Sequence, residues 1–131
     1  MIVADTSALV AVLRHEPVAK AFLHVIDQAR ACLLSAVSYL ETSLVLAGRT
    51  RDWTAWNGLD ALVREAGMQV MPFDADQAEA AREAFTRFGK GRHPAALNFG
   101  DCAAYGLAKT RRAPLLFKGG DFAATDVARA G

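Results

Sequence analysis

Acidic side chains occur at four points of this chain where the neighbouring residues are apolar or form a tight turn. Asp5 directly follows an apolar run, Glu41 and Asp101 each fall within a helical pattern of apolar residues, and Asp121 follows two glycines. An ionised carboxylate among apolar neighbours is costly unless a positive charge meets it. Carboxylates without His or Cys are typical ligands of Mg²⁺ or Mn²⁺. Because such ions lower the pKa of bound water and neutralise a phosphodiester, we predict metal-dependent hydrolysis of nucleic acid.

Glu41 is identified by its place within a predicted helix over residues 35–47. The apolar residues of this helix form one stripe, made of Val37, Leu40, Leu44 and Val45. Glu41 lies inside that stripe, because it follows Val37 by four residues and precedes Leu44 by three. A carboxylate on the apolar face of its own helix indicates a functional group rather than an ordinary surface residue.

Asp101 stands in the same relation to a second helix, predicted over residues 94–109. It follows Leu97 by four residues and precedes Ala104 by three, and no Lys or Arg lies three or four residues away. Burial alone would raise the pKa of such a carboxyl group. Two interpretations remain open: a metal ligand, or an acid near a helix start that the first-turn amides stabilise.

Asp5 also admits two interpretations. It lies at the end of a predicted strand over residues 2–4, and ligands of open α/β sheets collect at the carboxyl ends of strands. Asp, Thr and Ser are also good helix N-caps, so Asp5, Thr6 and Ser7 could begin the following helix. Asp74 is different, because Asp74 and Gln77 have the spacing of a capping box, which predicts a structural role.

Strands and helices alternate along the chain. Apolar runs predict strands over 2–4, 31–34, 68–73 and 114–117, with a short edge strand over 127–128. Helical spacing predicts helices over 8–13, 17–29, 35–47, 75–88 and 94–109, and a further helix that opens at Arg49, Arg51 and Asp52 and ends at Gly67. This alternation predicts a single α/β domain over 1–131, with a mostly parallel sheet in three layers.

Basic residues are concentrated near the predicted site although the net charge is only +1. Lys90 and Arg92 lie in a glycine-punctuated loop before the helix of Asp101, and Lys118 precedes the Gly119-Gly120 turn. Such local charge is enough to contact phosphates, although the loop could also be an ordinary solvated connection.

The first residues, the apolar runs and the cysteines indicate where in the cell the protein is expected. The first five residues include an acid and no basic leader, so they do not resemble a signal peptide. No apolar run approaches the roughly 18 residues that span a bilayer. Cys32 and Cys102 show no metal-binding spacing. They read as core residues of a reduced, cytoplasmic protein without a membrane segment.

Taken together, four segments resemble the PIN-domain ribonucleases, and within them the VapC-type toxins of bacterial toxin–antitoxin modules. The segments are Asp5-Thr6-Ser7-Ala8, Glu41 in its helix, Asn98-Phe99-Gly100-Asp101-Cys102, and Leu116 to Phe122 with Thr125-Asp126. The resemblance covers nearly the whole chain. It implies a four- or five-stranded parallel sheet with helices on both faces, Mg²⁺-dependent RNA cleavage (Mn²⁺ may substitute), a homodimer, and inhibition by a cognate antitoxin.

The resemblance also implies roles for single residues. Asp5 and Asp101 match the metal-ligand aspartates of the family, Glu41 its helical acid, and Asp121 the acid of its Gly-x-Asp-Phe turn. Since Gly120 stands where relatives often carry a polar residue, either Asp121 or Asp126 completes the set. Thr6 and Ser7 match hydroxyls that orient a ligand or water, and the basic residues Lys90, Arg92 and Lys118 are expected to bind the substrate.

Two other classes share part of this pattern. A phosphoaspartate phosphatase places Asp-x-Asp after its first strand, but Ser7 occupies the second position here. A receiver-type signalling domain would use Asp74 as its phosphoacceptor and Lys118 after its last strand. It needs paired acids after the first strand, however, and leaves Glu41 and Asp101 unexplained.

Overall fold

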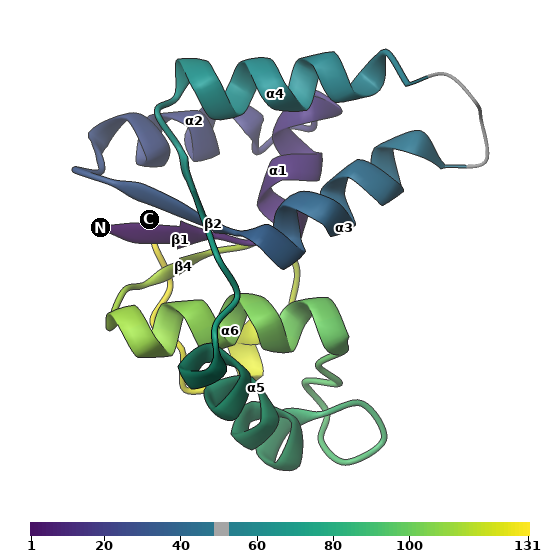
Figure 1. Cartoon of the computed structure of the whole chain (residues 1–131), viewed down its shortest axis with the longest axis vertical. Helices are drawn as coiled ribbons and strands as arrows, with labels where there is room; N and C mark the ends of the chain where they lie inside the picture. The colour runs from purple at the N-terminus through teal and green to yellow at the C-terminus, as the bar shows by residue number, and fades with distance from the viewer. Residues whose placement is uncertain (49–52) are drawn as a thin grey trace.

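The computed structural model describes residues 1–48 and 53–131. The elements, in chain order, are β1 (Ile2–Ala4), α1 (Thr6–Leu13), α2 (Ala19–Gln28), β2 (Cys32–Ser35), α3 (Ala36–Ala47), α4 (Ala55–Glu65), β3 (Gln69–Met71), α5 (Ala75–Phe88), α6 (Phe99–Arg111), β4 (Leu115–Leu116) and the 3₁₀ turn η1 (Phe122–Ala124) (Figure 1). The predicted opening of α4 at Arg49, Arg51 and Asp52 lies outside the described residues. The four main predicted strands are confirmed: β1 has the predicted bounds, β2 is shifted by one residue, and β3 and β4 are shorter than predicted.

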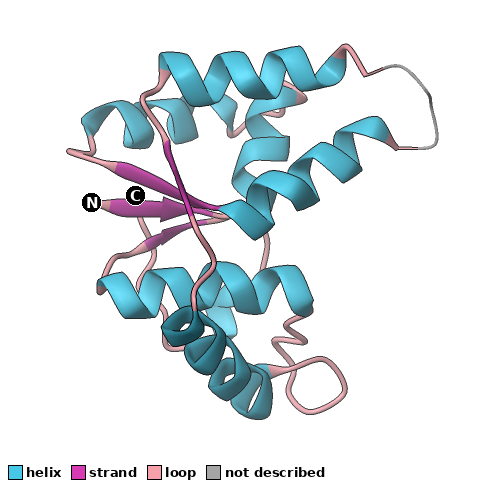
Figure 2. Cartoon of the chain, in the orientation of Figure 1, coloured by secondary structure: helices cyan, strands magenta, loops and turns pink. Residues whose placement is uncertain are grey.

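The sheet has four strands in the order β3-β2-β1-β4, and every pair in it is parallel. Helices cover both faces: α1, α2 and α4 lie on one side, and α5 and α6 lie on the other (Figure 2). Since successive strand residues point to opposite faces, each strand feeds two cores. Leu34 packs with the α1 side and Leu33 with the α6 side. The expected three-layer α/β architecture is therefore confirmed, with all carboxyl ends of the strands at one edge.

Side-chain caps fix where α1, α3 and α5 begin. Asp5 accepts a hydrogen bond from the Ser7 N–H at 2.9 Å and so caps α1. Ser35 caps α3 in the same way, and Asp74 caps α5 by accepting from the Gln77 N–H at 2.9 Å. Gln77 does not complete a reciprocal box, because its side-chain amide donates to the Pro72 carbonyl instead. Asp74 thus has the structural role that its spacing predicts.

The helix predicted over 94–109 begins later than expected, at Phe99. Leu97 belongs instead to the preceding loop, where it forms an isolated parallel β-bridge with Gly89. Its backbone accepts a hydrogen bond from the Lys90 N–H and donates one to the Phe88 carbonyl. Ala96 takes a φ of 53°, which interrupts a helix. The apolar spacing of Leu97 with the helix was misleading, because its side chain is fully buried from a loop position.

The predicted edge strand at 127–128 is also corrected. The C-terminal segment meets β4 only through an isolated parallel bridge between Leu115 and Arg129, supported by the Leu115 N–H donating to the Ala128 carbonyl. Cys32 and Cys102 are buried free thiols, as expected. Within the part of the chain that the structure describes, no helix is long and apolar enough to cross a membrane.

Candidate metal centre

Asp5 lies at the carboxyl end of β1 and is only 3% exposed. Its backbone N–H donates to the Leu116 carbonyl of β4, which fixes the residue between two strands. One carboxylate oxygen, Oδ2, accepts from the Ser7 N–H, whereas Oδ1 has no hydrogen-bond partner among the described residues. Both interpretations of Asp5 therefore hold geometrically: it caps α1 and also keeps one buried oxygen available to a ligand.

Asp101 lies in the first turn of α6 and takes part in a complete capping box. Its Oδ2 accepts from the Asn98 N–H at 3.0 Å, and its own N–H donates to Asn98 Oδ1 at 2.9 Å. This arrangement matches the open alternative of an acid stabilised near a helix start. It also holds the carboxylate of Asp101 in one place at the end of α6 that lies near the sheet edge (Figure 1).

Glu41 reaches this region from α3. Its carboxylate lies against the backbone of Gly100, so that a Cβ built on Gly100 would overlap with it. The stripe that drew attention to Glu41 is nevertheless not the buried face of α3. Leu40 and Leu44 are about 60% exposed, while Ser38 and Thr42 on the same helix are fully buried.

The acids influence one another electrostatically. The pKa of Asp5 is raised to about 7, mainly by burial. The charges of Asp101 and Glu41 contribute in the same direction, and the hydrogen bonds from Ser7 act against them. Burial also raises the pKa of Asp101, with Asp121 and Glu41 acting in the same direction and the Asn98 hydrogen bond opposing them. The four predicted acids thus share one electrostatic environment.

This environment fits a divalent cation. Asp5 offers a buried oxygen without a partner, and Gly100 leaves the space that the Glu41 carboxylate fills. The donors are all carboxylate oxygens, the ligand type that Mg²⁺ and Mn²⁺ prefer. Over residues 1–48 and 53–131, no three His, Cys, Asp or Glu side chains are gathered closely enough to enclose an ion by themselves.

The hydroxyl groups next to Asp5 are used within the protein. Thr6 is buried and donates to the Ser38 carbonyl at 3.3 Å, which ties α1 to α3. Ser7 accepts from the Lys118 N–H at 3.0 Å, which ties α1 to the chain after β4. Lys118 Nζ forms an ion pair with Glu16, although the side chain remains exposed.

The basic loop lies between α5 and α6 and its charged side chains are exposed. Lys90 donates its backbone N–H to the Leu97 carbonyl, which shapes the loop and leaves its ammonium group outside. The guanidinium of Arg92 lies over the ring of Phe85, 5.5 Å from its centroid. The loop is therefore held to α5 while it presents positive charge.

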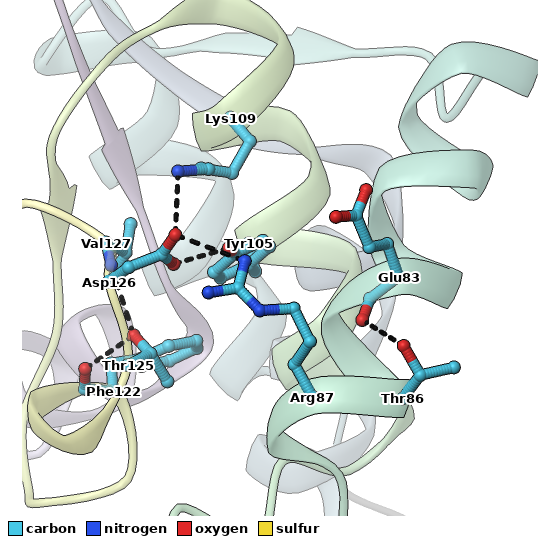
Figure 3. A network of polar contacts seen from close by, with 9 residues as sticks. All are labelled: Glu83, Thr86, Arg87, Tyr105, Lys109, Phe122, Thr125, Asp126 and Val127. Atoms are coloured by element: carbon cyan, nitrogen blue, oxygen red, sulfur yellow. Dashed lines mark hydrogen bonds and ion pairs between the residues drawn. The ribbon is translucent and has the colours of Figure 1, made fainter.

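Asp126 belongs to a different cluster (Figure 3). It accepts from the Tyr105 hydroxyl at 2.5 Å and from Lys109 at 3.2 Å, and it forms an ion pair with Arg87 at 3.4 Å. Although partial burial raises the pKa of Asp126, the hydrogen bonds from Tyr105 and Lys109 and the charge of Arg87 lower it overall. The charge of Asp121 acts on Asp101, whereas Asp126 is held by cations of α5 and α6.

Two features of the site were missed at the level of sequence. Asn98 is the N-cap of α6, and the pair Asn98 and Asp101 has the spacing of a capping box, the same signal that identified Asp74. Phe99 is 77% exposed, the most exposed large apolar side chain among the residues described. Both were missed because the predicted helix over 94–109 placed Asn98 and Phe99 in its interior rather than at its start.

Comparison with known proteins assigns a class to this fold and this group of acids. A family model for the PIN domain matches residues 2–128. Among solved structures, VapC20 of Mycobacterium tuberculosis, described as a sarcin-ricin loop cleaving toxin, has a TM-score of 0.77 at 18% identity and covers 98% of this chain and 97% of that chain. A toxin–antitoxin complex from Klebsiella pneumoniae has a TM-score of 0.71 at 16% identity, covering 96% and 93%. The chain belongs to the PIN domain family.

A closer group is identified by sequence. The chain is 48% identical over 126 residues to ribonuclease VapC30 of M. tuberculosis, an alignment that covers 96% of this chain and 95% of that protein. Within the PIN domain family, the chain therefore belongs with the VapC ribonucleases. This confirms the resemblance drawn from its segments, whereas the solved structures, at under 25% identity, support the fold alone.

Proposed function

We propose that this chain is an Mg²⁺-dependent endoribonuclease whose catalytic centre consists of Asp5, Glu41, Asp101 and Asp121. The observation that carries the proposal is the state of Asp5. Its carboxylate is almost fully buried at the end of β1, has one oxygen without a partner in the described chain, and lies within the electrostatic reach of Glu41 and Asp101. A buried acid surrounded by other acids is unfavourable without a cation, so the group is suited to binding one.

The residues of the chain would divide the work of the reaction. The four carboxylates would hold Mg²⁺, or Mn²⁺ in its place, and the ion would supply a water of lowered pKa and neutralise the phosphodiester. The Ser7 N–H holds one oxygen of Asp5, and the Asn98 N–H holds one oxygen of Asp101, so each carboxylate keeps the other oxygen for the ion. Exposed Lys90, Arg92 and Lys118 would attract the RNA backbone.

The test is cleavage of RNA by the purified chain. The wild type should cut single-stranded RNA in Mg²⁺ or Mn²⁺ and lose activity in a chelator. Asp101→Asn should lower cleavage by at least about 100-fold, because even residues that merely orient metal ligands are worth 10- to 100-fold. Its amide oxygen can still accept from the Asn98 N–H, so α6 should remain capped.

Asp74→Asn is the matched control, because it makes the same substitution at a helix cap that lies on another element, and Asn caps equally well. It should leave cleavage unchanged. If folded Asp101→Asn cut RNA as fast as the wild type, the four-carboxylate centre would be wrong.

The proposal also has a cellular part: the chain acts in the cytoplasm as a toxin, and a cognate antitoxin inhibits it. The solved structure from K. pneumoniae that shares this fold is described as a toxin–antitoxin complex. On α3, exposed Leu40, Leu44 and Val45 form an apolar surface on which a partner protein could pack. An antitoxin Arg or Lys could pair with the acidic centre directly.

Growth provides the test in cells. Expression of the wild type should arrest growth, Asp5→Ala at equal protein level should be tolerated, and co-expression of the antitoxin encoded alongside should restore growth. We also expect a homodimer, which light scattering of the purified chain would detect. Growth arrest by a folded Asp5→Ala variant would separate toxicity from this site.

A further inference from the structure

An apolar hollow of about 430 Å³ opens between α5 and the start of α6. Three aromatic side chains line it, Phe73 before α5, Phe85 on α5 and Phe99 on α6, together with Cys102 and three alanines. Among the residues that the structure describes, Arg82 is the only charged one in the lining, and no acid lines the hollow. The hollow therefore differs from the acidic centre in chemistry, although the two share the first turn of α6.

The aromatic rings of the hollow are accompanied by cations. Arg82 belongs to the lining itself, and the guanidinium of Arg92 lies 5.5 Å from the centroid of the Phe85 ring. Phe99 is 77% exposed, so its ring offers a face to solvent rather than to the protein core. Exposed aromatic rings beside Arg side chains are the combination that stacks nucleobases and holds the backbone of single-stranded nucleic acid.

The position of Phe99 relative to Asp101 adds a geometric reason. The two residues are the first and third of α6, and two helical steps of about 100° place them on opposite sides of the helix start. A strand whose phosphodiester lies at Asp101 would cross the beginning of α6 and bring a neighbouring base to Phe99.

We infer that this hollow holds a nucleobase of the RNA substrate, stacked on Phe99 next to the phosphodiester that is cut. The inference rests on the proposed function, since it takes the acidic centre as the place of cleavage. A protein segment is the less suitable occupant. Among the described residues, the charges at the hollow are those of Arg82 in its lining and of Arg92 over the Phe85 ring, and both match the phosphates of RNA.

The experiment measures binding without cleavage. A fluorescent single-stranded RNA of random sequence and an abasic strand of the same length are titrated with the full chain, with Ca²⁺ in place of Mg²⁺ and the RNA checked for integrity. Phe99→Ala should weaken binding of the RNA by about 5- to 150-fold, the range for losing one stacked base. It should leave binding of the abasic strand unchanged, and Phe99→Trp should restore affinity for the RNA.

Leu23→Ala is the control, because it removes an exposed apolar side chain on α2, on the opposite side of the sheet from the hollow. It should bind both strands like the wild type. The inference is overturned if the wild type binds no RNA, if Phe99→Ala binds RNA normally, if both strands lose affinity equally, or if Phe99→Leu restores as well as Trp. Normal RNA binding by Phe99→Ala with weakened antitoxin binding would assign the hollow to the partner protein.

Cleavage by the wild type in Mg²⁺ separates this inference from the proposed function. Base-dependent binding through Phe99 without any cleavage would support the hollow and refute the catalytic proposal. Cleavage by the wild type together with insensitivity to Phe99→Ala would support the catalytic proposal and refute the hollow.

Discussion

The carboxylate of Glu41 on α3 lies directly against the backbone of Gly100 on α6. No other side chain fits at position 100 without moving the carboxylate, since a Cβ there would overlap with its oxygens. Gly100 immediately precedes Asp101, so one close approach brings two of the acids together. The helix–helix contact and the candidate centre are therefore the same structural feature.

Gly100→Ala is expected to lower RNA cleavage by about 10- to 100-fold, because the added methyl group displaces Glu41 from the centre. Loss of a group that orients a metal ligand has an effect of this size in other metal sites. The affinity for Mg²⁺ should fall in parallel, which titration calorimetry would measure.

Gly106→Ala is its control. It lies six residues further along α6, where an added Cβ would lie 2.5 Å from the Gln77 carbonyl oxygen of α5. This variant should lower the midpoint of thermal unfolding while keeping the Mg²⁺ affinity of the wild type. Equal Mg²⁺ affinities for Gly100→Ala and the wild type would show that Glu41 does not act at the centre.

Asp121→Asn and Asp126→Asn should fail in different ways. Asp121 interacts with Asp101, so its amide should weaken Mg²⁺ binding and cleavage while the stability stays close to that of the wild type. Asp126 is held by Tyr105, Lys109 and Arg87. Asp126→Asn should therefore lower the free energy of unfolding by about 1–2 kcal/mol and leave the Mg²⁺ affinity unchanged. Urea unfolding and calorimetry on both variants would decide which acid completes the centre, and the reverse pattern would assign it to Asp126.

The sequence predicted more of the sheet than of the site. Apolar runs were enough to locate four strands. β1, β2 and β4 are buried on both faces and leave a continuous apolar signal, whereas β3 is largely exposed. Asp5 followed from this, since it ends the first run. The reasoning that selected Glu41 was different, because the apolar stripe around it is exposed. The buried residues of α3 include the polar Ser38 and Thr42 instead. A hydrophobic pattern cannot distinguish a core face from an interaction face.

The apolar pattern placed the start of α6 too early, although the capping-box spacing of Asn98 and Asp101 marks the true start. Leu97 continues the apolar spacing of the helix, yet it is buried from a loop whose shape depends on the positive φ of Ala96 and on pairing with Gly89. These are tertiary contacts without a local signal. The displaced helix start hid the exposure of Phe99, on which the inferred nucleobase site depends.

Without metal, the protein should be most stable at acidic pH. Burial raises the pKa of Asp5 from 3.8 to about 7, so between these values the folded chain binds a proton that the unfolded chain releases. The free energy of unfolding should therefore fall as pH rises from about 4 to 7 and level off above. The raised pKa of Asp101 acts in the same direction, whereas the lowered pKa of Asp126 matters only as pH falls below its ordinary value.

Urea unfolding across this pH range, with and without Mg²⁺, would test the trend. Mg²⁺ binds the ionised carboxylates, so it should reverse the loss at neutral pH. Asp5→Asn removes the titrating group and should flatten the metal-free profile. A wild-type profile in chelator that rises from pH 4 to 7 would contradict the burial of an uncompensated acid at this position.

Lys90→Ala combined with Arg92→Ala should weaken RNA binding and reduce its dependence on salt. Each phosphate contact that is lost lowers the slope of log affinity against log salt by about 0.7 for a single strand. Binding to RNA in Ca²⁺, measured over a series of salt concentrations, would give this slope. Arg111→Ala with Arg112→Ala is the matched control, since both residues are exposed at the other end of α6, away from Asp101. An unchanged slope in the Lys90 and Arg92 variant would mean that the loop does not contact RNA. An equal reduction of the slope in both variants would mean that RNA is attracted by the overall positive charge rather than by the loop.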